Sequence, residues 1–267
     1  MIEQILSDLV FSVVVIAILF LGLLLISNWV FLNRFREDVL YMREEQEEGV
    51  DTEQLALPRP LRNYLLKVNG ESQERYKQCF ITYEGFKRIK EGRSLNPVKG
   101  EQFYLTDRPS YMWMGFSKAN PIVRVSHMEK LSKNEGRFFS RLWSIFTVKK
   151  EDGSDVVERL RYTYFSEMVW FPQSFIHYGS VQWTEVSERE VDGDFGNGMS
   201  VSLLFNDEGL IERASANRKS GEWTVHYSDY RKNQDDVVVP YRLDTYWKQK
   251  DEHEQETRVF LKTVHYE

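Results

Sequence analysis

The chain has 267 residues, 14% of them aromatic, which is enough for one large domain with an ample hydrophobic core. Its formal net charge of -6 argues against sequence-independent binding of nucleic acid, which needs clustered Lys and Arg. Cys79 is the only cysteine, so an intrachain disulfide and a cysteine-based zinc site are excluded.

The first segment is apolar over a length that fits a lipid bilayer. No charged residue occurs from Leu9 to Leu32, and 18 of these 24 positions are Leu, Ile, Val or Phe. A helix of this length rises about 36 Å, which exceeds the roughly 30 Å of a hydrocarbon core. Glu3 and Asp8 precede it without Lys or Arg, unlike the basic start of a signal peptide. We therefore expect residues 1–33 to be an uncleaved transmembrane anchor of a single-pass protein of the cell membrane, in contact with lipid through residues 9–32.

The charges that flank this segment bear on its orientation. Arg34, Arg36 and Arg43 follow the segment, whereas no Lys or Arg precedes it. The positive-inside rule then favours a cytoplasmic soluble domain. Because large domains can be translocated regardless of flanking charge, the side of the membrane stays open.

Residues 34–56 form a charged linker between the anchor and the domain. Val39, Leu40 and Met42 are too few for a sustained apolar stripe, so we expect a solvated helix that ends near Gly49. The acidic run that begins at Glu44 is typical of a solvated spacer, and a docking patch for a partner is the alternative.

A single β-rich globular domain is predicted for residues 57–267. Pro58 and Pro60 favour an extended entrance, and apolar residues at helical spacing predict a short helix over 61–68. Alternating apolar and polar residues then predict about eleven strands, and the clearest hairpin turns at Asn206–Gly209. The strands are expected at about 76–84, 99–106, 110–118, 121–131, 136–149, 180–187, 199–206, 209–217, 222–230, 237–248 and 256–266.

One helix interrupts the strands at residues 155–170. Asp155 and Glu158 have the spacing of a capping box, and Pro172 prevents continuation. Because the predicted strands and helices do not alternate as in βαβ units, the sequence predicts a mainly β (α+β) fold. We expect one strongly curved antiparallel sheet, half-barrel-like and open or closed, with helices on its concave face and water on its outer face.

Four ordered stretches resemble a family of uncharacterised prokaryotic proteins that is classed as a domain of unknown function. They are LPRPLRNYL at the domain entrance, YFSEMVWFP from Tyr164 to Pro172, VQWTEV with VSLLFNDEGLI, and the segment from Trp223 to Trp247. Together they cover about 57–267, although Thr163 stands where the family often shows Arg. The resemblance implies an N-terminal membrane anchor, and its strand count is similar to the open half-barrels of lipoprotein carriers. It implies no activity, ligand or catalytic residue.

Motifs for catalysis and metal binding are absent from the sequence. The loop Asp192–Gly198 lacks EF-hand ligands at its fifth and twelfth positions, Gly196 and Leu203, so a Gly-rich hairpin connection is favoured. The five histidines have no ligand spacing, and no GxSxG, P-loop or GxGxxG motif occurs. We therefore expect no catalytic site, no metal site and no cofactor.

Glu167 is the most informative single residue. The predicted helix places it at the edge of the apolar face, near Tyr164 and Trp170, where burial would raise its pKa. Together with Trp183, these residues are our candidate ligand-binding set. The alternative is that Glu167 pairs with a strand arginine and that both tryptophans belong to the core.

Taken together, these features favour a membrane-anchored, non-catalytic binding module that holds a lipid or another apolar ligand between sheet and helices. A structural or interaction domain that docks a membrane protein partner is the alternative. An enzyme that uses Glu167 with a neighbouring Tyr is a third hypothesis. A cavity of several hundred Å³ would favour ligand binding over the interaction domain.

Overall fold

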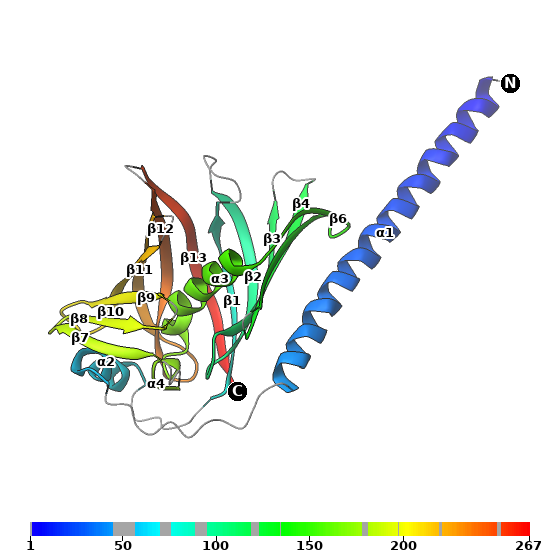
Figure 1. Cartoon of the computed structure of the whole chain (residues 1–267). Coiled ribbons are helices and arrows are strands. Elements are labelled where there is room, and N and C mark those ends of the chain that lie inside the picture. The colour runs from blue at the N-terminus through cyan, green and yellow to red at the C-terminus, as the bar shows by residue number, and fades with distance from the viewer. Residues whose placement is uncertain are drawn as a thin grey trace.

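The computed structural model describes residues 2–44, 57–69, 76–88, 95–118, 123–133, 135–177, 181–196, 198–218, 221–249 and 252–267. Within these residues, 13 strands form one antiparallel sheet, with α3 inside its curve and α1 outside it (Figure 1). The helices are α1 (Ile2–Glu44), α2 (Arg59–Asn69), α3 (Ser154–Glu167), the short η1 (Met168–Trp170) and α4 (Ser174–His177). The strands are β1 (Gln78–Lys87), β2 (Asn96–Leu105), β3 (Ser110–Lys118), β4 (Arg124–Ser132), β5 (Glu135–Leu142), β6 (Phe146–Asp152), β7 (Gln182–Ser187), β8 (Glu190–Asp194), β9 (Ser200–Phe205), β10 (Ile211–Arg218), β11 (Gly221–Lys232), β12 (Val238–Gln249) and β13 (Glu252–Tyr266).

Within the described residues, the sheet is an open half-barrel that does not close on itself. Its strand order is β6-β5-β4-β3-β2-β1-β13-β12-β11-β10-β9-β8-β7, so β6 and β7 are the edges of the sheet. The first and last strands pair in its middle, from Cys79 opposite Tyr266 to Lys87 opposite Thr257. Because α3, η1 and α4 connect β6 to β7, the chain crosses from one edge to the other over the concave face.

The expected mainly β half-barrel is confirmed, with two more strands than predicted. The predicted strand 136–149 is two strands, because Trp143 and Ser144 take positive φ values of 51° and 61° and turn the chain. Strand β8 includes Asp192, which we assigned to a Gly-rich connection. Gly193 allows the backbone of β8 to lie close to the Trp183 ring, because a Cβ at position 193 would lie 2.5 Å from Cζ3 of Trp183.

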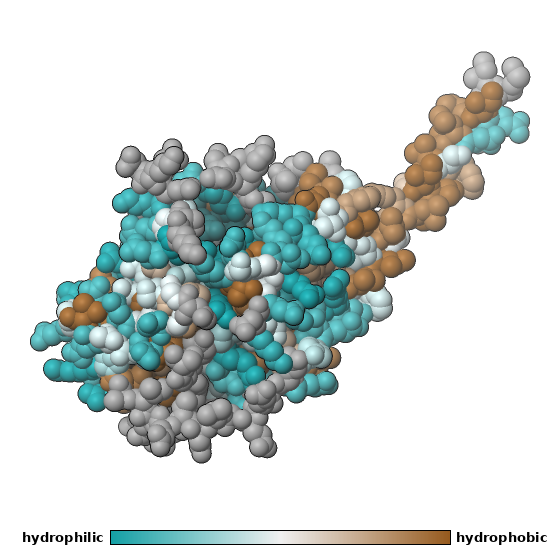
Figure 2. All heavy atoms as spheres, in the orientation of Figure 1, coloured by the Kyte–Doolittle hydropathy of each residue, from teal (hydrophilic) through white to brown (hydrophobic). Residues whose placement is uncertain are grey.

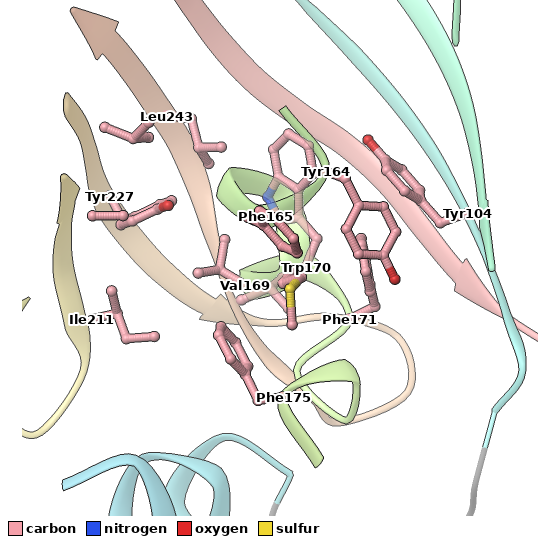
Figure 3. Close-up of a cluster of buried hydrophobic side chains, with 14 of the residues drawn as sticks. Tyr104, Tyr164, Phe165, Val169, Trp170, Phe171, Phe175, Ile211, Tyr227 and Leu243 are labelled. Carbon is pink, nitrogen blue, oxygen red and sulfur yellow. The ribbon is translucent and has the colours of Figure 1, made fainter. Parts of the chain in front are cut away.

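The main hydrophobic core lies on the concave face, where α2 and α3 pack. The predicted stripe of α2 is buried, as is the apolar side of α3, and Figure 3 shows how the residues after Tyr164 converge on the sheet. The predicted capping box at Asp155 is wrong. Gly153, with a φ of 103°, is the N-cap of α3, and no side chain caps the helix with a hydrogen bond.

The C-terminal part of α1 packs on the convex face of the sheet, so the expected solvated helix is wrong for residues 34–44. Four of its apolar residues, spaced at i, i+4, i+8 and i+11, form a buried cluster with side chains of β2, β3 and β4. We missed this stripe because it begins at Phe31, inside the apolar segment. Gly49 and the acidic run beyond Glu44 lie outside the described residues. The cluster consists of Phe31, Phe35, Val39, Met42, Phe103, Leu105, Met112, Met114 and Met128.

The N-terminal part of α1 leaves the domain and presents apolar side chains on its surface. Of the described residues, only this helix has the length and hydropathy to cross a membrane. Figure 2 shows it as a hydrophobic rod that projects from a mostly hydrophilic domain. The outer face of the sheet is therefore covered by α1 over β2 to β4, rather than wetted as we expected.

Candidate functional site

Glu167 lies at the end of α3 with its side chain inside the concave core. The residue is 7% exposed, and the amide nitrogen of Gln102 lies 3.2 Å from each of its carboxylate oxygens. The Tyr104 hydroxyl donates a further hydrogen bond to the same carboxylate. Burial raises the pKa of Glu167 to about 7, although these hydrogen bonds favour the ionised form. The raised pKa that we predicted is therefore confirmed.

A second buried carboxylate, Glu129 on β4, belongs to the same polar cluster. Lys87 donates to one of its oxygens at 3.0 Å, and the Tyr111 hydroxyl donates to the other at 3.2 Å. Burial alone would raise the pKa of Glu129, but the positive charges of Lys87 and Arg159 hold it below its ordinary value. The cluster thus has one carboxyl that is protonated up to neutral pH and one that stays ionised.

Paired carboxyl groups with opposed pKa shifts can serve in acid–base chemistry. Here Glu129 and Glu167 are only 5% and 7% exposed, and the stacked rings of Tyr104 and Tyr111, 5.5 Å apart, lie between the strands and α3. In this conformation the pair is a polar element of the core and has little contact with solvent.

The four predicted site residues do not form one group. Tyr164 is fully buried, donates from its hydroxyl to the Leu105 carbonyl at 2.8 Å, and has its ring 6.0 Å from that of Tyr104. Glu167 and Tyr164 are therefore linked through Tyr104. The indole nitrogen of Trp170 (Figure 3) instead donates to the Pro240 carbonyl on β12 at 2.9 Å.

Trp183 lies apart from the other three, on the edge strand β7. It is partly buried, and its ring packs against Phe175 and Phe195 at 5.7 and 5.8 Å. A ligand-binding role for the predicted set stays a prediction.

A cleft of about 900 Å³ lies at the open side of the half-barrel. One wall comes from β5 and β6, the floor from the first turns of α3, and the other wall includes Met199, which precedes β9. Gly136 allows this arrangement, because a Cβ there would lie 2.9 Å from the Cα and N atoms of Val157. None of the four predicted residues lines the cleft.

The lining of the cleft combines an apolar floor with a charged rim. Val157 and Met199 supply the apolar part. The rim carries both signs of charge, from Arg137, Lys150, Arg161, Glu135, Asp152 and Glu158. Sequence reasoning missed this site because each charged residue has the pattern of a solvated surface. Two glycines could have indicated the cleft. Gly136 allows β5 to approach α3 closely, and Gly153 has a positive φ.

The family model for DUF6544, described as a family of unknown function, matches residues 48–258. The chain belongs to DUF6544. This confirms the resemblance to an uncharacterised family. No curated protein matches this DUF6544 chain.

Among solved structures, the DUF6544 chain is similar to a DUF1329 family protein from Desulfovibrio piger, with 10% identity, a TM-score of 0.48, and coverage of 79% of this chain and 94% of that one. It is also similar to a LolA superfamily protein from Nitrosomonas europaea, with 9% identity, a TM-score of 0.44, and coverage of 76% and 92%.

Proposed function

We propose that this protein is a membrane-anchored, non-catalytic module that binds a lipid-like amphiphile at the open side of its half-barrel. The cleft of about 900 Å³ between β5–β6 and the start of β9 carries this proposal. Small-molecule sites in proteins commonly have volumes of about 300–1,000 Å³. A cleft of this volume supports ligand binding over the alternative of an interaction domain.

The chemistry of the lining favours an amphiphile over a pure hydrocarbon. Val157 and Met199 offer apolar contact for a chain, whereas Arg137 and Lys150 stand at the rim with carboxylates nearby. A ligand with an apolar part and a charged or zwitterionic head matches both regions.

The anchor supports the same proposal by placing the cleft near a source of lipid. From Leu9 to Leu32 the sequence is uncharged, and the helix continues without a break into the part that is buried on the sheet. This continuity supports an uncleaved anchor, because the membrane-spanning stretch and the domain share one helix.

Photo-crosslinking in lipid nanodiscs tests the proposal. The full chain is reconstituted with a phospholipid that carries a diazirine on its acyl chain, irradiated, digested and mapped by mass spectrometry. We expect labelled peptides from the start of α3 and from the segment around Met199, in addition to α1. Val157→Trp should remove the first two by filling the cleft, whereas Val186→Trp, on exposed β7, should leave them unchanged. Labelling confined to α1 in the unmodified chain would contradict ligand binding in the cleft.

A further inference from the structure

The hairpin of β5 and β6 contacts α1 at residues that belong to its apolar span. The Ser27 hydroxyl donates to the Ser144 carbonyl at 2.7 Å. Closer to the N-terminus, the Phe20 ring meets the Trp143 ring edge-on, with centroids 5.8 Å apart. Figure 1 shows the tip of this hairpin beside the middle of α1. The tip therefore reaches the depth of residues that we assign to the bilayer.

The turn at this tip has an unusual composition. Trp143 and Ser144 both have positive φ, and the Ile145 amide donates to the Leu142 carbonyl at 3.0 Å, which closes a tight turn. Four-residue turns with positive φ at both central positions favour Asn and Gly there, and a bulky side chain at such a position is strained. A half-buried tryptophan in a strained backbone conformation is typical of a functional position.

The side chains next to the turn are exposed and apolar. Phe146 is 55% exposed and Val148 is 58% exposed, on an edge strand that carries Lys149 and Lys150 only further from the tip. Together with the partly buried Trp143 and Ile145, they give the tip an apolar surface that continues the surface of α1. Figure 2 shows hydrophobic atoms both on the helix and on the edge of the domain that faces it.

Three arginines gather at the level just beyond this tip. The Arg34 and Arg141 guanidinium groups lie 5.5 and 5.2 Å from the Phe139 ring, and that of Arg124 lies 4.0 Å from the Phe116 ring. No salt bridge within the described part of the chain pairs any of them with a carboxylate. Burial and the nearby charge of Arg34 lower the pKa of Arg141, as expected for like charges that lack an anion.

The helix rise relates these contacts to the bilayer. Twenty residues from Leu9 to Asn28 span about 30 Å, the thickness of a hydrocarbon core. Ser27 then lies at the boundary of the core, and Phe20 lies about 10 Å deeper along the helix. Arg34 lies about 9 Å beyond Asn28 on the other side, at the level of the headgroups.

We propose that the tip of the β5–β6 hairpin, residues 142–148, is a second membrane contact that inserts beside α1, while Arg34, Arg124 and Arg141 face lipid phosphates. The inference rests on the membrane anchoring by α1 in the proposed function. Interfacial apolar elements enter a bilayer by about 5–10 Å, which matches the offset between Ser27 and Phe20. Two attachment points would also hold the domain in one orientation on the membrane.

Depth-dependent quenching in reconstituted vesicles tests this contact with the full chain. The fully buried Cys79 is first replaced in a Cys79→Ala background, and an environment-sensitive nitrobenzoxadiazole label is attached to Phe146→Cys. Matched positions are Val186→Cys, equally exposed on the remote strand β7, and Leu25→Cys, exposed on α1. The vesicles contain phosphatidylcholine and phosphatidylglycerol, with or without nitroxide-bearing phospholipid.

We expect the labels at positions 146 and 25 to be quenched several-fold more strongly than the label at position 186. Quenching at position 25 with solvent-like emission at both other positions would overturn the hairpin contact alone. If position 25 also escaped quenching, the anchor itself would be wrong. For the arginines, Arg141→Gln should reduce quenching at position 146 in phosphatidylglycerol vesicles. Equal quenching at position 146 with and without Arg141→Gln would overturn the phosphate contact.

Discussion

The Tyr104 hydroxyl donates a hydrogen bond to the Glu167 carboxylate, which joins the end of α3 to the middle of the sheet. Both residues are buried, and the pKa of Glu167 is raised to about 7 by burial. The charge of this core carboxyl group therefore changes in the neutral range.

The contribution of Glu167 to stability should fall as pH rises through this range. The native state keeps the Glu167 proton up to about pH 7, whereas the unfolded chain loses it near 4.5. This stabilisation is complete at pH values below the pKa of Glu167 in the unfolded chain. It is lost as pH rises to the pKa of Glu167 in the folded protein, a total of about 3 kcal/mol. Thermal unfolding at pH 5 and pH 8 measures this difference. Burial lowers the pKa of His127 to about 4, which makes stability rise with pH over part of the same range. The Glu167 contribution is therefore the change in pH dependence between the unmodified chain and Glu167→Gln, and an unchanged slope in that variant would show that Glu167 is not responsible.

Breaking the ion pair between Lys87 and Glu129 should strongly lower the free energy of unfolding, because Glu129 is buried. Lys87→Met leaves Glu129 without its nearest cation in the core, and such a loss costs about 3 kcal/mol. The control is Lys99→Met, which breaks an exposed pair with Glu84 and should have little effect. Chemical denaturation of the three proteins measures the difference. Equal losses in the two variants would mean that the burial of Glu129 does not matter.

The sequence predicted the class of fold because alternation and turn residues are local signals. Asn206 illustrates this: its side-chain oxygen accepts from the amides of Glu208 and Leu210, and Gly209 supplies the positive φ that the turn needs. The turn at Trp143 carried no such signal, because tryptophan and serine are not typical of positive φ. The predicted strand therefore ran through it.

The site was predicted only in part, for a similar reason. The position of Glu167 on a helix face follows from helical periodicity, so its burial and raised pKa could be foreseen. Its contacts with Gln102 and Tyr104 depend on the register of distant strands, which periodicity does not determine. The cleft combines β5, α3 and the segment before β9, and no local pattern brings these together.

The packing of α1 on the sheet should be as important for stability as the concave core. Met42 is 1% exposed, whereas Leu40 of the same helical turn is 56% exposed. Met42→Ala should therefore lower the free energy of unfolding by about 2–4 kcal/mol, and Leu40→Ala should change it little. Denaturation in detergent measures both. Similar values for the two variants would contradict the docking of residues 31–42.

The cleft should depend on Gly136, because the Cβ of any other residue would meet the backbone of α3. That Cβ would lie 2.9 Å from both Cα and N of Val157, and 3.1 Å from its Cγ2. Gly136→Ala must therefore move β5 away from the helix, which should cost about 1–3 kcal/mol and reduce photolabelling at Met199. Gly22→Ala is the control, since nothing lies within 4 Å of its Cβ position. Adding Val157→Ala should not restore stability, because it removes only the Cγ2 contact and leaves the two backbone contacts. Full rescue by this second change would show that the side chain of Val157, rather than the helix backbone, sets the width of the cleft.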